Sequence, residues 1–240
     1  MARTSPPESE LANETQSPGS AKAARIRNIL QRYIAFEGCD LLDIGTGSGE
    51  TAAGLQALGA TVTAIDRQDN GLRADGLDFR LVEGTDLPFG DAAFDAVLYT
   101  RVIEHVGGLG DQRNHLSEIR RVLRNSGVLY LAVPNRWSVF EPHYKLPLLS
   151  WFPARIASAY LQMTGRGEIY DCLPHSRKSL RSLFEESGFQ GEEVTGEVLD
   201  AVLREPLRNL LAQGISLILA RLRFLSLPLI PVLVFVARPR

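Results

Sequence analysis

Apolar and polar positions alternate along this chain in two rhythms, and together they predict a regular succession of strands and helices. Amphipathic helices, in which apolar residues recur every three or four positions, are predicted at 22–36, 114–123 and 176–188. Short, nearly continuous apolar runs predict strands at 39–45, 61–66, 79–84, 94–100 and 127–134. This order predicts an α/β fold, with a doubly wound, mostly parallel sheet that carries helices on both faces.

Two segments interrupt this succession. Residues 136–174 lack a clear period and contain several aromatic residues and four prolines, so we expect a cap or lid here. Residues 202–230 form an apolar C-terminal segment, and the valine-rich run 231–239 predicts a last strand. Neither apolar run of this region reaches the roughly 18–20 residues that a membrane-spanning helix needs.

Composition narrows the class of protein. Residues 1–20, rich in Ser, Pro, Glu and Ala, predict a disordered tail, and 21–240 predict a single domain. The N-terminus lacks the apolar core of a signal peptide, which favours a cytoplasmic location. A net charge of −2 predicts no nucleic-acid partner. Two distant cysteines give neither a disulfide framework nor a metal cluster.

The stretch LLDIGTGSGE, from Leu41 to Glu50, places three closely spaced glycines between a predicted strand and a predicted helix. Glycines let a backbone approach a ligand closely, and a helix N-terminus offers free N–H groups to a phosphate or a carboxylate. A dinucleotide, a mononucleoside and a tight turn without a ligand all remain compatible with this loop alone.

Two acids add information. Asp66 ends the second strand, where doubly wound sheets place an acid that accepts hydrogen bonds from ribose hydroxyls. Asp43 lies inside the apolar first strand and needs a partner, because an unpaired buried charge is costly. We expect backbone N–H groups of the glycine loop, or a cationic group of a ligand, to supply that partner.

These motifs resemble, in order, those of the class I S-adenosylmethionine-dependent methyltransferases. LLDIGTGSGETA is similar to the first motif, VTAID to the second, and VEGTDLPFGDAAFDAVLYTRVIEHV to the third motif and fourth strand. EIRRVLRNSGVLYLAVPN and HSRKSLRSLFEESGF resemble the elements that follow. The resemblance is close over 38–135 and looser over 175–190, and it implies a Rossmann-like sheet of seven strands.

The resemblance also implies S-adenosylmethionine as the cofactor. Asp43 would lie near the ammonium group of its methionine part, and Asp66 would hold the ribose hydroxyls. Glu83, where the family often has Asp, would contact the adenine amino group, although Asp86 is a second candidate. The full set of implied cofactor-binding residues is Asp43, Gly45, Thr46, Gly47, Gly49, Asp66, Arg67, Glu83, Gly84, Leu87, Thr100 and Arg101.

Methyl transfer to a hydroxyl requires a base, and a histidine suits that task near neutral pH. His105, His143 and His175 lie after the fourth strand or in and beside the cap, so we take all three as catalytic candidates. Ordinary loop packing explains each of them equally well. His115 is expected on the exposed face of its helix. Some quinone O-methyltransferases of the family carry an additional Glu where this chain has Arg101, so we predict no metal site.

The acceptor is expected to be a small, lipophilic or lipid-linked molecule with a hydroxyl group. Aromatic residues with nearby cations suit a membrane interface, so one hypothesis is peripheral membrane contact through 137–160 and 202–230. Burial of the apolar segment in a homodimer, or against the acceptor, is an alternative. Two rival functions remain: a nicotinamide-dependent oxidoreductase, and a catalytically silent scaffold with the same fold.

Overall fold

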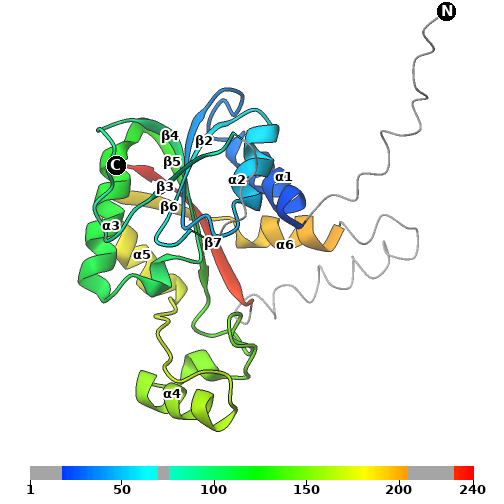
Figure 1. Ribbon diagram of the computed structural model, residues 1–240, viewed down its shortest axis with the longest axis vertical. Coiled ribbons are helices and arrows are strands. Elements are labelled where there is room, and N and C mark those ends of the chain that lie inside the picture. Colours follow the sequence, from blue (N-terminus) through cyan, green and yellow to red (C-terminus); the bar gives the residue numbers. More distant parts are fainter. Residues whose placement is uncertain (1–17, 70–75, 205–229) are drawn as a thin grey trace, which may run out of the picture.

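The computed structural model describes residues 18–69, 76–204 and 230–240. Seven strands form one sheet in the order β3-β2-β1-β4-β5-β7-β6 (Figure 1). They are β1 (Asp40–Ile44), β2 (Thr61–Asp66), β3 (Asp78–Leu81), β4 (Phe94–Thr100), β5 (Leu123–Pro134), β6 (Phe189–Glu193) and β7 (Val232–Pro239). Neighbouring strands are parallel except where β7 runs antiparallel to β5 and β6. The predicted doubly wound, mostly parallel, Rossmann-like sheet is thereby confirmed.

Helices cover both faces of the sheet, as Figure 1 shows. One face carries α1 (Pro18–Leu30), α2 (Glu50–Ala57) and α6 (Thr195–Arg204), and the other carries α3 (Leu109–Val122) and α5 (Arg177–Glu186). Each face has its own core of fully buried side chains, with Leu41, Leu55 and Leu98 on the first and Leu42, Tyr99 and Leu116 on the second. Consecutive strand residues alternate between the two cores, because their side chains point to opposite faces.

Helix ends follow local signals. Ser176 caps α5, since its Oγ accepts a hydrogen bond of 3.1 Å from the backbone N–H of Ser179. Gly188, with φ +73°, lies just beyond the end of the same helix. The first helix spans Pro18–Leu30 rather than the expected 22–36, and it begins before the expected domain start. Residues 1–17 and most of the apolar segment 202–230 lie outside the described residues.

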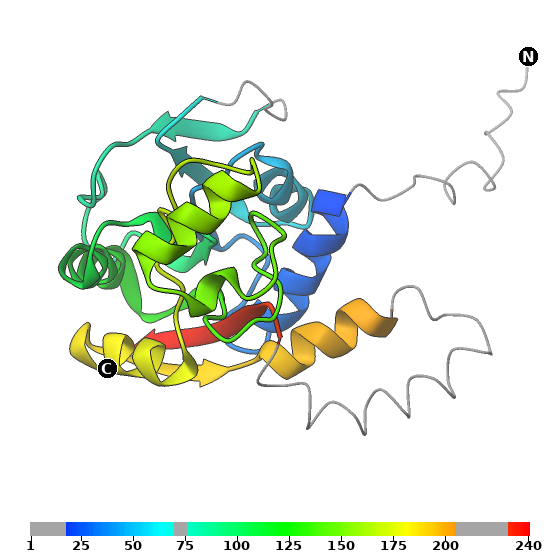
Figure 2. The same ribbon diagram turned by 90° about the horizontal axis from the view of Figure 1, so that it is seen from below.

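The cap, residues 136–174, leaves the carboxyl end of β5 and forms a lobe with its own small core. It contains α4 (Ala154–Met163) and the short 3-10 helix η3 (Leu149–Trp151). Leu149, Ala157 and Leu161 are fully buried in this lobe. Seen from below, the lobe lies across the end of the sheet (Figure 2). We call the loops that follow β1, β2 and β4, together with the 3-10 helix η2 (Ile103–His105), the sheet rim.

No helix within the described ranges combines the length and the apolar character needed to cross a membrane.

Candidate active site

The glycine loop of the sheet rim has a backbone that only glycine adopts readily. Gly45, Gly47 and Gly49 have φ values of +71°, +61° and +75°, in the left-handed region that penalises a Cβ atom. The N–H groups of Gly45 and Thr46 both donate to the Ile65 carbonyl, at 2.8 and 3.1 Å. A side chain at Gly45 would also collide with Val102. The motif therefore fixes a tight turn between β1 and α2.

Two adjoining hollows lie beside this loop. One is polar, has a volume of about 530 Å³, and is bordered by Lys22, Asp43 and Thr100 among others. The other is apolar, has a volume of about 220 Å³, and is bordered by Ile65 and Leu87 among others. Gly45, Arg101 and His105 border both hollows. The two hollows therefore form one cleft with a polar end and an apolar end.

Most of the predicted site residues line this cleft. Those in the polar hollow are Asp43, Gly45, Thr46, Gly47, Thr100, Arg101, His105 and His143. Those in the apolar hollow are Gly45, Asp66, Arg67, Gly84, Leu87, Arg101 and His105. Gly49, Glu83 and His175 border neither. Gly49 instead caps α2.

Glu83 is the clearest departure from expectation. Its side chain is exposed, whereas Val82 and Gly84 on either side of it face the apolar hollow. Gly84 has no side chain and a φ of +79°, so its backbone borders the hollow while the Glu83 side chain lies in solvent. The second candidate at this place, Asp86, is also exposed and does not line the hollow.

Asp43 is a buried charge that faces the polar hollow. It is 2% exposed, and burial raises its pKa to about 6. The Thr46 hydroxyl and the Lys22 ammonium oppose this rise, although Thr46 Oγ1 reaches full hydrogen-bond geometry with no described group. The N–H groups of the glycine loop, which the sequence predicted as partners of Asp43, donate to other acceptors. Asp43 thus presents a buried carboxylate to the cleft.

Asp66 holds the glycine loop from the neighbouring strand. Its Oδ2 accepts a hydrogen bond of 2.8 Å from the Gly47 N–H, and its Oδ1 accepts one of 3.2 Å from the Gln68 N–H. Each carboxylate oxygen can accept a further hydrogen bond, and Asp66 borders the apolar hollow. The residue therefore combines loop positioning with free acceptor capacity.

The contacts that hold the Leu87 backbone beneath the apolar hollow were not predicted from the sequence. The Leu87 N–H donates to Glu118 Oε2 at 3.1 Å, and Arg121 donates to the Leu87 carbonyl at 2.9 Å. The ion pair of Arg121 with Glu118, 2.7 Å long, joins this donor and this acceptor on α3. The spacing of Glu118 and Arg121 on the helix is visible in the sequence, but their contact with Leu87 is not.

His115 lies in the core, so the expectation that it is exposed was wrong. It is 4% exposed, and its Nδ1 is 2.8 Å from the Tyr99 hydroxyl. The buried stripe of α3 includes Gln112, His115, Ile119 and Val122, a wider face than the leucine and isoleucine positions alone define. Burial lowers the pKa of His115 to about 4, which keeps the ring neutral beside the apolar hollow.

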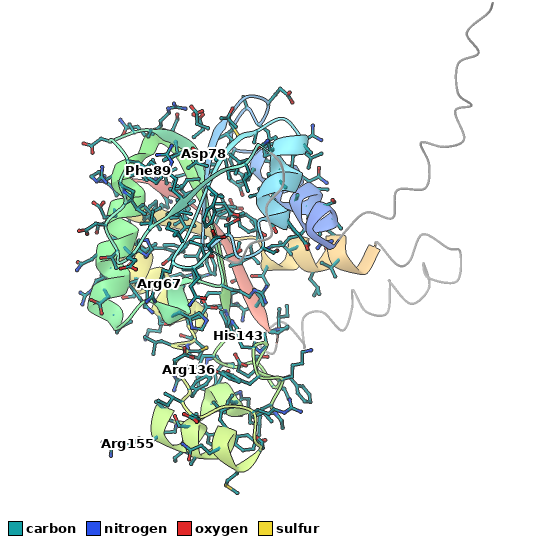
Figure 3. All side chains as sticks on the ribbon, in the orientation of Figure 1. Arg67, Asp78, Phe89, Arg136, His143 and Arg155 are labelled. Atoms are coloured by element: carbon teal, nitrogen blue, oxygen red, sulfur yellow. The ribbon has the colours of Figure 1, made fainter. Side chains whose placement is uncertain are left out.

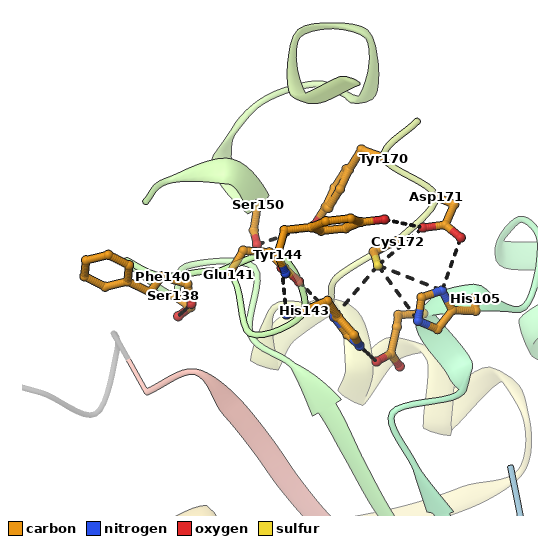
Figure 4. Close-up of polar contacts among 11 residues, drawn as sticks. His105, Ser138, Phe140, Glu141, His143, Tyr144, Ser150, Tyr170, Asp171 and Cys172 are labelled. Carbon is orange, nitrogen blue, oxygen red and sulfur yellow. Dashed lines mark hydrogen bonds and ion pairs between the residues drawn. The ribbon is translucent and has the colours of Figure 1, made fainter. Parts of the chain in front are cut away.

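The cap closes over the polar end of the cleft with a cluster of titratable side chains (Figure 4). His143 Nδ1 is 2.9 Å from Glu141 Oε1, and the N–H groups of His143 and Tyr144 donate to Glu141 Oε2. On the other side of the ring, His143 Nε2 is 3.6 Å from Oε1 of Glu104. The hydrogen bond to Glu141 raises the pKa of His143. Burial, in contrast, lowers the pKa of His105.

Glu104 stands next to His105 in η2, and sequence reasoning did not select it. It is 1% exposed, and burial raises its pKa to about 7. Apart from a contact with its own backbone amide, neither carboxylate oxygen has a hydrogen-bond partner among the described residues. No pattern in the sequence places the cap beside it, so its surroundings were not predictable.

His175 is separated from the cleft. It is 2% exposed, its Nε2 is 3.1 Å from Gln112 Oε1, and its Nδ1 is 3.4 Å from Ser179 Oγ. Burial lowers its pKa to about 4. Because both ring nitrogens contact other side chains and the ring borders neither hollow, His175 acts as a structural link between β5, α3 and α5.

Comparison with known proteins decides the family. A family model described as "Methyltransferase domain" matches residues 42–131. Over 111 residues the chain is 35% identical to a ubiquinone biosynthesis O-methyltransferase of Caulobacter vibrioides, covering 42% of this chain and 43% of that protein. A longer match, 28% identical over 205 residues, covers 81% of this chain and 71% of a Mycolicibacterium smegmatis protein named "Probable S-adenosylmethionine-dependent methyltransferase/".

Residues 42–131 carry the domain of the class I S-adenosylmethionine-dependent methyltransferases, as the motifs predicted. A Methanosarcina mazei S-adenosylmethionine-dependent methyltransferase of known structure has the same fold, with a TM-score of 0.53 and 20% identity, over 88% of this chain and 96% of that one. The cofactor is therefore S-adenosylmethionine, as predicted. The match spans less than half the length of the Caulobacter relative.

The cleft suits this cofactor on physical grounds. S-adenosylmethionine has a charged amino-acid end and a largely apolar adenine end, and the methyltransferase cleft has a polar hollow next to an apolar one. Asp43 supplies a buried carboxylate at the polar end. The mid-cleft residues Gly45, Arg101 and His105 then border the place where the sulfonium would lie.

Proposed function

We propose that this protein transfers the methyl group of S-adenosylmethionine to a hydroxyl of a lipophilic small molecule. The observation that supports the proposal is the cleft itself. Its polar hollow and its apolar hollow meet at His105, beneath a cap rich in titratable side chains. The cofactor supplies an activated methyl group, so the protein must align the acceptor oxygen and receive its proton.

The sheet rim would hold the cofactor. Asp43 would bind the ammonium group, and the free N–H groups at the start of α2 would face the carboxylate. Asp66 would accept hydrogen bonds from the ribose, and Leu87 would pack on adenine. The remaining rim residues that line the cleft, Gly45, Thr46, Gly47, Arg67, Gly84, Thr100 and Arg101, would complete the contact surface.

The cap side would hold the acceptor. His105 and His143 border the polar hollow, and their rings meet edge to face at a centroid distance of 5.2 Å. An acceptor hydroxyl that enters from the cap meets these two imidazoles and loses its proton to the titratable cluster of which they, with Glu104, are part. His175 is not carried into this proposal, because it borders neither hollow.

The apolar surface of the cap supports a lipophilic acceptor. Trp137, Phe140, Trp151, Phe152 and Ile156 are all exposed. Arg155 lies at the outer edge of the same lobe (Figure 3). The name of the Caulobacter relative points to a quinone-type acceptor for that protein, which makes a phenol with an isoprenoid tail the first acceptor to assay here.

The acceptor test uses S-adenosylmethionine with a labelled methyl group and three matched compounds. These are a prenylated phenol, the same phenol without its tail, and the prenylated aniline. We expect methylation of the prenylated phenol, with a several-fold lower kcat/KM for the tailless phenol. Preferential methylation of the aniline would contradict the hydroxyl acceptor. No turnover of any compound or of cell lipid extract, despite cofactor binding, would favour the scaffold alternative.

The same apolar surface leads us to propose peripheral membrane contact. Flotation with vesicles that contain anionic lipid should recover the protein, and Phe140→Ala with Ile156→Ala should reduce recovery several-fold. Leu81→Ala is the matched control, since Leu81 on β3 is 59% exposed, like Phe140 at 61%. Absence of flotation together with a dimeric mass in solution would instead assign this surface to a second copy.

A further inference from the structure

Two histidines and a cysteine from distant parts of the chain converge beside the polar hollow. His105 comes from η2, whereas His143 and Cys172 come from opposite ends of the cap. Cys172 Sγ lies 3.9 Å from both ring nitrogens of His105 and 3.9 Å from Nδ1 of His143. Figure 4 shows the sulfur between the two rings. One ligand atom from each residue lies within 4.8 Å of the others.

These distances are close to those of a metal centre. With Zn–S of about 2.3 Å and Zn–N of about 2.0–2.1 Å, a tetrahedral ion separates sulfur and nitrogen ligands by about 3.5 Å. The separation of 3.9 Å between Cys172 Sγ and either ring nitrogen of His105 exceeds this value by a few tenths of an ångström. His143 needs a ring rotation as well, because its Nδ1 is bonded to Glu141 and leaves Nε2 as the ligand atom.

Glu104 provides an independent indication that a cation belongs here. Its side chain is fully buried, and its Oε1 is 3.6 Å from His143 Nε2. Neither carboxylate oxygen has a hydrogen-bond partner among the described residues beyond its own amide contact. A buried, unpaired carboxylate is costly, and a metal ion bound nearby would reduce that cost.

His143 is also oriented as a metal ligand. Its Nδ1 is 2.9 Å from Glu141 Oε1, so this nitrogen donates to the carboxylate and Nε2, which faces Glu104, keeps its lone pair. A histidine that ligates a metal usually donates its other N–H to a carboxylate or carbonyl in this way. Glu141 is itself 1% exposed and held by two backbone N–H groups.

We propose that His105, His143 and Cys172 bind a zinc ion at the junction of cap and sheet rim, with Glu104 beside it. Two nitrogens and a thiolate suit zinc and do not suit magnesium or calcium, which prefer oxygen ligands. The negative charges of the thiolate and of Glu104 balance the ion. The ligands reach the site through the fold, which is why the sequence, with Arg101 in place of an acid, predicted no metal.

This inference rests on the proposed function, which it extends. His105 and His143 border the polar hollow, so the fourth zinc position opens toward the cleft. The acceptor hydroxyl displaces a bound water there and gives its proton to Glu104, because a bound cation lowers the pKa of an oxygen ligand. The resulting oxyanion forms the new C–O bond with the methyl carbon as the S–CH₃ bond breaks, which leaves S-adenosylhomocysteine.

The first test is metal content. Protein purified without a histidine tag, incubated with zinc and dialysed, should retain one zinc per chain. Cobalt substitution should give a near-ultraviolet thiolate-to-metal band in the wild type. The matched pair is Cys172→Ala, which should lose the band, and Cys39→Ala, which should keep it because Cys39 is the chain's other cysteine and lies in the core.

A second variant, His143→Asn, should lower zinc affinity about 10- to 100-fold, the range typical of damage to a metal site. Failure of the wild type to retain zinc, or an unchanged cobalt band in Cys172→Ala, would overturn the proposal. Calorimetry with S-adenosylhomocysteine separates the zinc proposal from the proposed methyltransferase function. Folded variants should still bind it, whereas a wild type that binds zinc but not S-adenosylhomocysteine would contradict the proposed function alone.

Discussion

The sheet rim and the cap build one cleft from opposite sides, but they are held in place by different kinds of contact. At the rim, glycine backbone conformations and N–H groups of adjacent strands fix the geometry, as in the bonds from Gly45 and Thr46 to Ile65. Where the cap docks on the rim, side chains far apart in sequence do so, as with His105 and Cys172, 67 positions apart. The rim therefore has a sequence signature, whereas the cap has none.

The sharpest way to break this comparison is to change Asp43, the buried carboxylate of β1 that faces the polar hollow. Asp43→Asn should lower affinity for S-adenosylhomocysteine about 100-fold, because a hydrogen bond to a charged group contributes about 1.5–3 kcal/mol. Calorimetry measures the loss. The control is Asp78→Asn, an exposed acid that lies far from the cap (Figure 3). Equal affinity in Asp43→Asn and the wild type would remove Asp43 from the site.

A backbone test separates collision from conformational strain within the glycine loop. Gly45→Ala should lower the free energy of unfolding by about 2–3 kcal/mol, since the new Cβ meets Val102 in addition to an unfavourable φ. Gly47→Ala, with open space around its Cβ, should cost only about 1 kcal/mol. Urea unfolding measures both. Similar losses in the two variants would mean that the collision with Val102 has no energetic weight.

A variant of the cap should lower turnover and leave cofactor affinity unchanged, whereas Asp43→Asn should lower cofactor affinity. Glu141→Gln removes the negative charge that holds His143, so the pKa of His143 should fall and turnover should drop about 10-fold, as expected for loss of a supporting carboxylate. Affinity for S-adenosylhomocysteine should stay within about twofold. A large loss of cofactor affinity in this variant would show that the cap and the rim are not separable.

The smallest expected effect is a gain in stability. The folded-state pKa of Asp43, about 6, lies above its ordinary value, so this group stabilises the fold at pH below its unfolded pKa and ceases to do so as pH rises through 6. Asp43→Asn should therefore be more stable than the wild type at pH 8, with the difference shrinking toward pH 4. Urea unfolding at both pH values provides the measurement. A difference independent of pH would contradict a buried, titrating Asp43.

The same contrast explains what the sequence could predict. Strand order, the glycine turn and most residues of the rim follow from local patterns, because the contacts that matter are made by neighbouring strands in a recurrent fold. His115 was misplaced because the buried face of α3 is wider than its aliphatic positions. Glu83 borders neither hollow, because the resemblance fixes a position in the chain but not the side to which a side chain turns.

The cap could be predicted only as a segment. Its aromatic residues and prolines marked 136–174 as unusual, but no spacing revealed that Glu104, Glu141 and Cys172 surround His143. Such clusters depend on how a lobe docks, which is decided by packing over the whole cap. His175, equally close to the cap in sequence, was for the same reason indistinguishable from His143.

The most direct test of the account is calorimetric titration of the wild-type protein with S-adenosylhomocysteine and, separately, with NADH. The cleft described here predicts binding of one S-adenosylhomocysteine per chain and no binding of NADH, with the heat of the first titration lost in Asp43→Asn. Binding of NADH without S-adenosylhomocysteine, or binding of S-adenosylhomocysteine that Asp43→Asn leaves unchanged, would contradict it.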